Sequence, residues 1–309
     1  MAINSPVDGT GILTRFEELV TDVVNTNIVW GINNLPFPEM PTTNYSLEST
    51  ILGQQNLTSP GTISLAVPSG ANAIHVIAAV GGGSGGVGGA AYDKGGGESA
   101  GAGGASGAYV SDKVFSVQAA ETLTMVVGSG GAGTIATVYN VTSTAGGTTS
   151  VSGSTSGVLF SLTGGGSSSG TGGNTHGPLR TNTAGAGGTA TIQSAVVLTS
   201  ATFVDVDGVS KNVNTLNGGP VGQFNQHGSG VSGTNPGNCL TDNCNIGGGN
   251  GGASYNGNIS GGAGGPNGST AGADGSRGSG GGGGGTEPSA SSGGAGGDGE
   301  IRYRFLAVT

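Results

Sequence analysis

Few side chains in this 309-residue chain have the types and spacing that catalysis requires. The three histidines, His75, His176 and His227, have no serine–aspartate or cysteine pattern near them that would build a triad. Matches to phosphate-loop patterns arise from the glycine content alone, and no helix is expected after them to hold a phosphate. The sequence therefore predicts a protein that is not an enzyme and that holds no cofactor and no metal.

The two cysteines, Cys239 and Cys244, lie in a polar stretch with four residues between them. This spacing allows a short local disulfide, and two free thiols are the alternative. A zinc site would need further ligands, and His227 is the nearest histidine.

Recognition is the chemistry that the remaining residues favour. Short interruptions of the glycine-rich stretches place aromatic residues beside Asn, Asp, Gln or His, a mixture that suits a hydrated contact surface. The plain alternative for each is a solvated loop. The candidate receptor-contact residues are Tyr92, Asp93, Lys94, His176, Phe224, Asn225, His227, Tyr255 and Asn256.

The net charge of the chain bears on which class of partner it could bind. The chain has 8 Lys and Arg against 17 Asp and Glu, which gives a net charge of −9. Nucleic acid is disfavoured as a partner, because neutralising phosphates needs clustered cations. The first residues lack the pattern of a secretory signal, and the longest apolar stretch, Ile74–Val80, is too short to span a bilayer. We therefore expect a chain that assembles in a cytoplasm without inserting into a membrane.

The candidate contact residues lie between glycine-rich stretches, so the backbone of these stretches must position them. In all, 71 residues are glycine. Disordered chains combine high net charge with few apolar residues, whereas here 8% of residues are charged and 33% are hydrophobic. Packed polyglycine-II helices are the ordered alternative, in which every backbone N–H and C=O pairs with a neighbouring segment. Collagen is excluded because the three-residue register is only local and the 11 prolines are too few. We expect polyglycine segments over about residues 81–108, 164–188 and 217–300.

Strand patterns alternate with the glycine runs. Ile63, Leu65 and Val67 share one face, and Pro68–Gly70 turns the chain toward an apolar strand from Ile74. We expect the stretches 108–117 and 122–127 to pair with each other, and Asp207-Gly208 to form a type I′ hairpin turn. The last strand has Ile301, Tyr303 and Phe305 on its inner face, and it should pair with strands from the first third of the chain.

The first 45 residues differ in kind. Apolar residues recur at alternating three- and four-residue steps, which is typical of a helix with a packing seam. A proline-rich connector follows at Leu35–Pro41. The helix could dock on its own domain, but a polar residue within the seam favours self-association. The seam, proposed for attachment and oligomerisation, comprises Leu13, Phe16, Val20, Val23, Asn27 and Trp30.

The order of these elements resembles the glycine-rich domain of bacteriophage tail-fibre and receptor-binding proteins. The resemblance covers roughly residues 57–309 and rests on a strand ending in VPSG, a strand entering poly-Gly, the turn VVGSGGAG, the strand GGTTSV and a glycine-rich entry into the last strand. The sequence is also similar to the glycine-rich domain of anaplastic lymphoma kinase. The N-terminus and the stretch Ala190–Thr215 depart from polyglycine phage adhesins. The resemblance implies a mainly β fold, a jelly-roll-like (TNF-like) β-sandwich with a polyglycine-II bundle over residues 46–309. The apolar seam predicts that a short helix precedes it, with the proline-rich connector, in residues 1–45.

We therefore expect a virion protein, a tail-fibre or receptor-binding adhesin, that forms a homotrimer. Residues 1–45 would bind other tail, baseplate or capsid proteins, and the loops would bind a host polysaccharide or outer-membrane protein. Two other classes stay open: a structural virion component, such as a capsid decoration or tail accessory protein, and an ice-binding or secreted matrix protein. The absence of a signal pattern counts against the last.

Overall fold

The computed structural model describes most of the chain after residue 52, and all of the described residues lie in the unit Thr50–Thr309. The predicted N-terminal helix, its seam from Leu13 to Trp30 and the domain boundary at residue 45 fall outside them. The described ranges are 53–89, 100–135, 141–170, 182–205, 207–235, 247–266, 270–285 and 290–309.

The described part is mainly β, as predicted. Its strands form antiparallel sheets, and its helices are three single 3-10 turns, η1 (Ser194–Val196), η2 (Val213–Thr215) and η3 (Tyr255–Gly257). None of these helices is long enough or apolar enough to cross a membrane.

The first large sheet has the order β1-β16-β3-β4-β12, and β15 also pairs with β4. Its longest strands are those with the most complete burial, because both of their faces are covered. The strands are β1 (Gln55–Leu57), β16 (Glu300–Leu306), β3 (Ala73–Val80), β4 (Tyr109–Ser116), β12 (Val197–Leu198) and β15 (Gln226–Gly228).

The second large sheet has the order β11-β8-β7-β5-β2. Its strands alternate between buried and more exposed residues, as in a sheet that packs on one face. They are β11 (Ala190–Ile192), β8 (Gly157–Leu162), β7 (Thr149–Gly153), β5 (Thr122–Val127) and β2 (Gly61–Ala66). Smaller pairings join β6 (Val141–Thr142), β9 (Ser169–Gly170) and β10 (Asn182–Thr183), and β13 (Thr202–Val204) with β14 (Ser210–Asn212).

The two large sheets pack against each other through aromatic and aliphatic side chains. Phe115 of β4 and Phe160 of β8 lie with ring centroids 5.8 Å apart, and both are fully buried. Leu123 and Met125 of β5 are also fully buried, as expected from two-residue alternation in a strand that packs on one face. The core is therefore a sandwich of two antiparallel sheets.

The predicted pairing of residues 108–117 with 122–127 is wrong. β4 pairs with β3, while β5 pairs with β2 and β7, so the connection between β4 and β5 crosses from one sheet to the other. Glu121 holds this crossing in place: its carboxylate accepts hydrogen bonds from the N–H groups of Gln118, Thr155 and Ser156. The short connection between the two strands suggested a hairpin. Instead, each strand joins a different sheet, and the apolar side chains of both are buried where the sheets face each other across the core.

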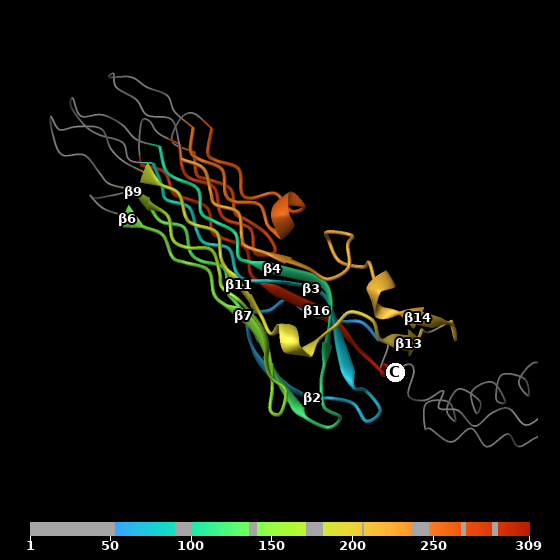
Figure 1. Cartoon of the computed structure of the whole chain (residues 1–309). Helices are drawn as coiled ribbons and strands as arrows, with labels where there is room; N and C mark the ends of the chain where they lie inside the picture. Colours follow the sequence, from blue (N-terminus) through green and yellow to red (C-terminus); the bar gives the residue numbers. More distant parts are fainter. Residues whose placement is uncertain are drawn as a thin grey trace, which may run out of the picture. The chain divides into compact units, whose positions relative to one another are not determined.

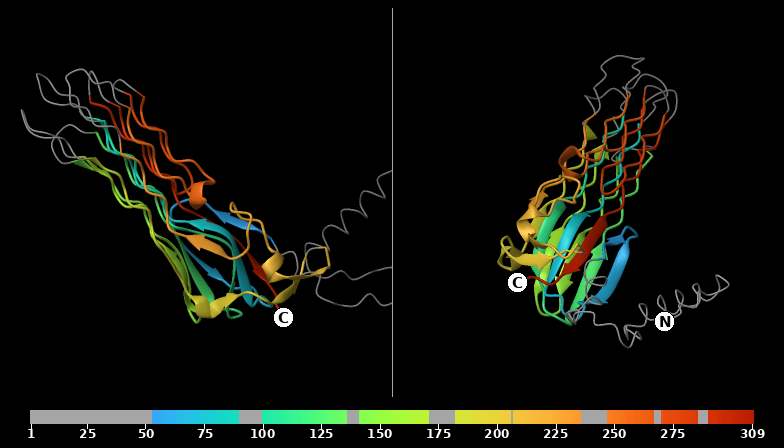
Figure 2. Two further views of the ribbon diagram at one scale, coloured as in Figure 1. Left: turned by 45° about the horizontal axis from the view of Figure 1, so that its top comes forward. Right: turned by 90° about the vertical axis from the view of Figure 1, so that its right-hand side faces the viewer.

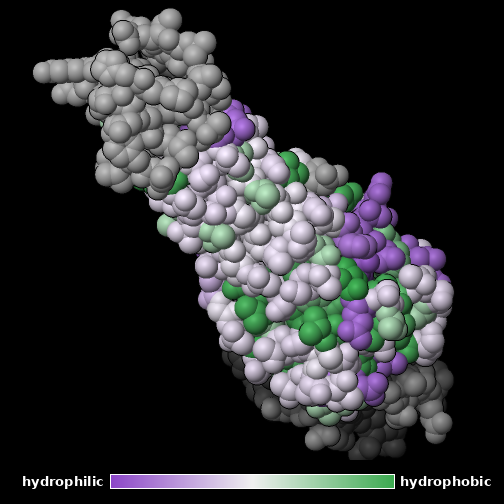
Figure 3. Space-filling model, turned by 60° about the vertical axis from the view of Figure 1, so that its left-hand side comes forward, coloured by the Kyte–Doolittle hydropathy of each residue, from purple (hydrophilic) through white to green (hydrophobic). Residues whose placement is uncertain are grey.

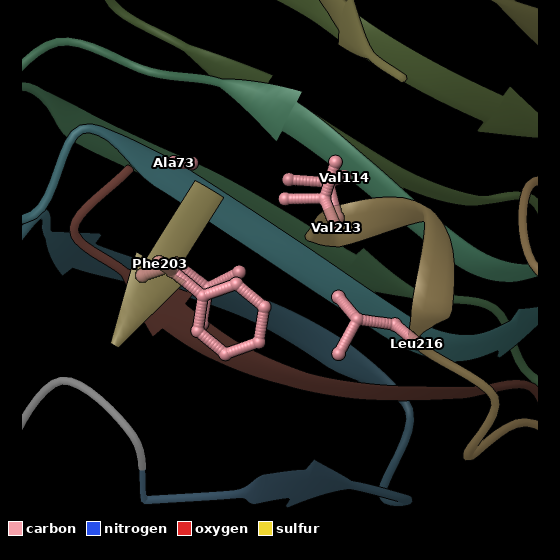
Figure 4. Packing of buried hydrophobic residues seen from close by; sticks show 6 residues of the cluster. Ala73, Val114, Phe203, Val213 and Leu216 are labelled. Carbon is pink, nitrogen blue, oxygen red and sulfur yellow. The ribbon is translucent and has the colours of Figure 1, made fainter. Parts of the chain in front are cut away.

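The outer face of the first sheet is covered by the segment 199–228. Val114 alternates with the inward Phe115, so it faces the other way, where it packs with Phe203, Val213 and Leu216 (Figure 4). The predicted hairpin is present as β13 and β14, but its turn is closed by the Gly208 N–H donating to the Asp205 carbonyl. Gly208 takes a φ of 73°, which a glycine adopts without strain.

Among the described residues, the glycine-rich stretches form extended segments that run side by side away from the sheets (Figure 1, Figure 2). Two of these segments, 128–134 and 143–148, lie outside the predicted polyglycine ranges. Each segment continues from or into an ordered strand or turn of the sandwich. We call these segments together the glycine bundle.

Residues 81–87 show how the bundle is bonded. Successive N–H groups donate to three different segments in a strict three-residue cycle, the period of a polyglycine-II helix. The acceptors of Gly81, Ser84 and Val87 are in 102–108, those of Gly82 and Gly85 in 144–147, and those of Gly83 and Gly86 in 294–297. Its carbonyl groups in turn accept from the segments 131–134, 165–168 and 281–284. One segment thus has six bonded neighbours.

At many glycine positions this packing leaves no room for a side chain. A Cβ built on Gly83 would lie 1.9 Å from the carbonyl oxygen of Ser279, and one on Gly101 would lie 1.7 Å from that of Val87. Such a Cβ meets backbone that is itself hydrogen-bonded and cannot rotate away. Glycine is required here for close approach, and its φ is secondary.

We predict that Gly83→Ala destabilises the fold by at least about 2 kcal/mol, because the overlap cannot be relieved without breaking the bonded segments. Gly218→Ala is the matched control, since its Cβ would meet nothing closer than 3.6 Å. Chemical denaturation followed by circular dichroism gives the comparison. Equal stability of the two variants would contradict the close-packed bundle.

The last strand completes the first sheet, as predicted. β16 lies between β1 and β3, and its Ile301 and Leu306 are fully buried. We predict that deleting residues 301–309 abolishes soluble expression, because it removes an interior strand. Deleting only Val308 and Thr309, which contact β13 and its flank, should leave a soluble protein. A soluble, cooperatively unfolding 300-residue truncate would refute the role of β16.

Candidate functional site

The glycine bundle brings many chain connections to one end. The described segments alternate in direction, and their ends contact each other: the Gly89 N–H donates to Ser291 Oγ (3.1 Å), and Asn182 Nδ2 donates to the Ala100 carbonyl (2.7 Å). We call this the sheet-distal end. It is formed by Gly89, Ala100, Ile135, Val141, Gly170, Asn182, Asn235, Gly247, Pro266, Thr270, Gly285 and Ala290.

Four candidate contact residues connect to this end. Tyr92, Asp93 and Lys94 lie outside the described residues, between Gly89 and Ala100, and His176 lies outside them between Gly170 and Asn182. The described flanks of both stretches belong to the sheet-distal end. Cys239 and Cys244 also fall outside the described residues, between Asn235 and Gly247, so the predicted disulfide stays a prediction.

The candidates Phe224, Asn225 and His227 lie elsewhere, beside the first sheet. β15 pairs with β4 so that His227 is opposite Val110, and the Asn225 N–H donates to the Asp112 carbonyl at 2.7 Å. Phe224 packs partly into the cluster on the outer face, whereas His227 is exposed. The structure therefore places these three candidates beside the first sheet and away from the sheet-distal end.

A lysine that the sequence analysis did not single out lies under Asn225. Lys113 of β4 is 3% exposed, and its ammonium donates to both the backbone carbonyl and the side-chain Oδ1 of Asn225. Burial lowers the pKa of Lys113 to about 8. Burial and the nearby charge of Lys113 also lower the pKa of His227. Asn225 itself has a φ of 63°, uncommon for a residue with a side chain.

Tyr255 is not a surface residue, so its prediction as a contact residue is wrong. The side chain is fully buried, its hydroxyl donates to Glu300 Oε1 at 2.6 Å, and its ring lies 5.9 Å from that of Tyr109. Burial and the Glu300 carboxylate raise the pKa of Tyr255 well above its ordinary value. The neighbouring Asn256 belongs to η3, and its side chain is outside the described part. Tyr255 instead joins the bundle to β16.

A buried polar network on the outer face was also missed. Asp112 accepts hydrogen bonds from the Gly218 and Gly219 N–H groups, at 2.9 and 2.7 Å, and its carboxylate lies 3.2 Å from His75 Nε2. Arg304 Nε donates to the other ring nitrogen of His75 at 3.2 Å. The signal was available in the sequence, since an Asp-Lys pair interrupts the apolar stretch Tyr109–Ser116.

This network fastens the covering segment to the sheet. Asp112 has a φ of 48°, a costly conformation that persists because the segment's backbone donors surround its carboxylate. Arg304 continues the network toward Asp205, which pairs with Lys211 of the hairpin. Among the described residues, no group of three His, Cys, Asp or Glu side chains could hold a metal. The geometry of the network indicates a structural role, in which it holds the covering segment against the sheet.

The visible surface of the bundle is chemically plain. In the space-filling view, hydrophobic and strongly hydrophilic residues gather over the sheets, while the described bundle surface is of nearly neutral hydropathy (Figure 3). A shallow depression of about 380 Å³ at the edge of the second sheet is lined by uncharged residues from Val158 and from 191–195. The arrangement suits presentation of loops more than binding of a small molecule in a cavity.

We predict that protonation of His75 weakens the fold. Burial lowers its pKa below the ordinary value, so the unfolded chain binds the proton more tightly, and stability is lost as the pH falls below about 6.5. The slope for one group is at most about 1.4 kcal/mol per pH unit. His75→Gln should flatten the dependence between pH 7.5 and pH 5.5 in denaturant titrations. His227→Gln is the control, because His227 is a second histidine whose pKa is lowered. An unchanged slope in His75→Gln would contradict the assignment of the pH dependence to His75.

Comparison with known proteins gives one family. A model of the glycine-rich domain family matches residues 58–306, which is nearly all of the described sandwich and bundle. No curated protein matches the chain. The match covers well over half of the chain and spans both the sheets and the polyglycine segments, so the chain belongs to the glycine-rich domain family.

Proposed function

We propose that this chain is a non-enzymatic virion protein, a bacteriophage tail-fibre or receptor-binding adhesin that recognises the host cell surface. The single observation that carries the proposal is the sheet-distal end of the glycine bundle. The bundle's flanking residues hold the two ends of each connection next to each other, so the bundle can present these connections on a hydrogen-bonded backbone scaffold.

The chemistry of those connections supports recognition. Residues 90–99 include Tyr92, Asp93 and Lys94, and residues 171–181 include His176, whereas the bundle that carries them has a surface of nearly neutral hydropathy. An aromatic ring beside charged and hydrogen-bonding groups suits a surface polysaccharide or the loops of an outer-membrane protein. Rigid support for such loops lowers the ordering cost of binding.

The remaining parts of the chain fit the same role. In our proposal the sandwich is a jelly roll of the TNF-like kind, and it anchors the bundle. Residues 1–45, with the apolar seam from Leu13 to Trp30, attach the protein to other tail, baseplate or capsid proteins and help to form a homotrimer. Assembly takes place in the host cytoplasm.

A structural virion component without receptor binding is the second candidate, and the edge of the second sheet favours it. β2 pairs only with β5 among the described strands, and Ile63 is 43% exposed although its partner Met125 is fully buried. An uncharged edge strand with an uncovered apolar residue is suited to contact with another protein. A capsid decoration or tail accessory protein would use that edge.

We expect the purified full chain to bind host cells and to reduce adsorption of the phage that encodes it. The double variant Tyr92→Ala, Lys94→Ala should lose at least about tenfold in cell affinity, the scale of one lost contact of 1.4 kcal/mol. His227→Ala, on the sheet side, is the matched control and should bind normally. Binding is measured by flow cytometry with labelled protein.

Two outcomes separate the candidates. If the protein neither binds cells nor competes with adsorption, and antibody labelling places it on the capsid, the structural role replaces the adhesin. If His227→Ala loses binding and the Tyr92→Ala, Lys94→Ala double variant does not, the contact surface is at β15 instead of the sheet-distal end.

A further inference from the structure

Lys113 and Asn225 form a pair whose chemistry goes beyond a hydrogen bond. Asn225 directly precedes β15, which pairs with β4, so Asn225 lies at the edge of β4 beside Lys113. Lys113 is 3% exposed, and its nitrogen contacts Oδ1 of the Asn225 side-chain amide. The two residues are 112 positions apart in sequence.

The surroundings leave the lysine without an acidic partner. Among the described residues, the hydrogen bonds of its nitrogen go only to Asn225. The carboxylate of the adjacent Asp112 is engaged by Ser111, Gly218, Gly219 and His75. A buried amine without a carboxylate loses its proton more easily than an exposed one, and its pKa of about 8 leaves about a tenth of the amine neutral and nucleophilic at pH 7.

The electrophile is held in place by the backbone. The Asn225 N–H donates to the Asp112 carbonyl at 2.7 Å, and the left-handed φ of 63° turns the residue over the lysine. Such a conformation costs energy in a residue with a side chain, and it keeps amine and amide in contact. Pre-positioning of this kind supplies most of what an intramolecular condensation needs.

We propose that Lys113 and Asn225 condense to form an intramolecular isopeptide bond that staples the segment 199–228 to β4. The neutral Nζ attacks Cγ of Asn225, and a new C–N bond forms. The bond from Cγ to Nδ2 breaks, and Nδ2 leaves as ammonia after taking a proton from the attacking nitrogen. No oxidant or other reactant is needed, and the chain loses one molecule of ammonia.

His227 is the group suited to carry that proton. It lies two residues after Asn225, on the strand that pairs with β4, and the charge of Lys113 acts on its imidazole. An imidazole accepts and donates protons near neutral pH, so it can relay one from the attacking nitrogen to the leaving group. His227 acts on the rate of the reaction and is not part of the bond.

Intact-mass spectrometry of the reduced, denatured full chain tests the proposal. We expect a mass lower than the sequence mass by one ammonia, and a tryptic map in which the peptide containing Lys113 is joined to the peptide containing Asn225. Lys113→Arg and Asn225→Gly should each restore the mass calculated from their own sequence. Asn225→Gly keeps the left-handed backbone accessible, so it separates loss of the amide from misfolding.

The decisive outcomes do not depend on the variants folding. A full sequence mass for the wild-type chain, with cleavage after Lys113 in the tryptic map, overturns the proposal. Asn225→Asp gives a second readout, because the same bond would then release water in place of ammonia. His227→Gln should slow the appearance of the lighter species in freshly purified protein without changing its final mass, and an unchanged rate would remove the relay.

Discussion

The backbone hydrogen bond between extended glycine segments is the interaction on which the rest of this molecule depends. A conventional core hides apolar side chains and leaves the backbone to pair within helices and sheets. In the bundle the pairing is itself most of the core, because segments such as 81–87 bond to six neighbours, nearly always backbone to backbone, with only small side chains such as that of Ser168 taking part. Each buried donor and acceptor that lost its partner would carry a desolvation cost of about 1–3 kcal/mol. The structure is stable because nearly all of them are paired at once.

The strands of the sandwich fix the ends from which the glycine segments of the bundle extend. Glycine segments lose much conformational freedom on ordering, so an isolated one would not stay extended. Each described segment enters or leaves a strand or a short turn that is already fixed by apolar packing, as at Val80–Gly81 and Gly299–Glu300. The buried pair Tyr255 and Glu300 lies at this junction. The hydrophobic effect orders the sheets, and the sheets then set the spacing of the segments.

Much of this arrangement could be predicted from the sequence, for reasons that differ between its parts. The polyglycine segments follow from composition, and the inner faces of β5 and β16 follow from two-residue alternation. The crossing between β4 and β5 could not be predicted, because alternation fixes which face is apolar but not which sheet the strand joins. The burial of Tyr255 and the contact of Lys113 with Asn225 depend on residues far apart in sequence. Local composition marked Tyr255 as a surface residue, and only the register of β15 against β4 brings Asn225 to the lysine.

The position of β16 has a consequence for how the chain is made. Of the described strands, β16, which lies between β1 and β3, is synthesised last, and the segments 279–285 and 290–299, which bond to residues 81–87, are synthesised just before it. Neither the first sheet nor the interior of the bundle can therefore close until these residues have been made. Contacts of such long sequence separation form slowly. The nascent chain must therefore stay soluble while its apolar strands are unpaired. Because few of its residues are charged, electrostatic repulsion between chains does little to prevent aggregation. This protein should therefore depend strongly on the chaperones of the cell that makes it.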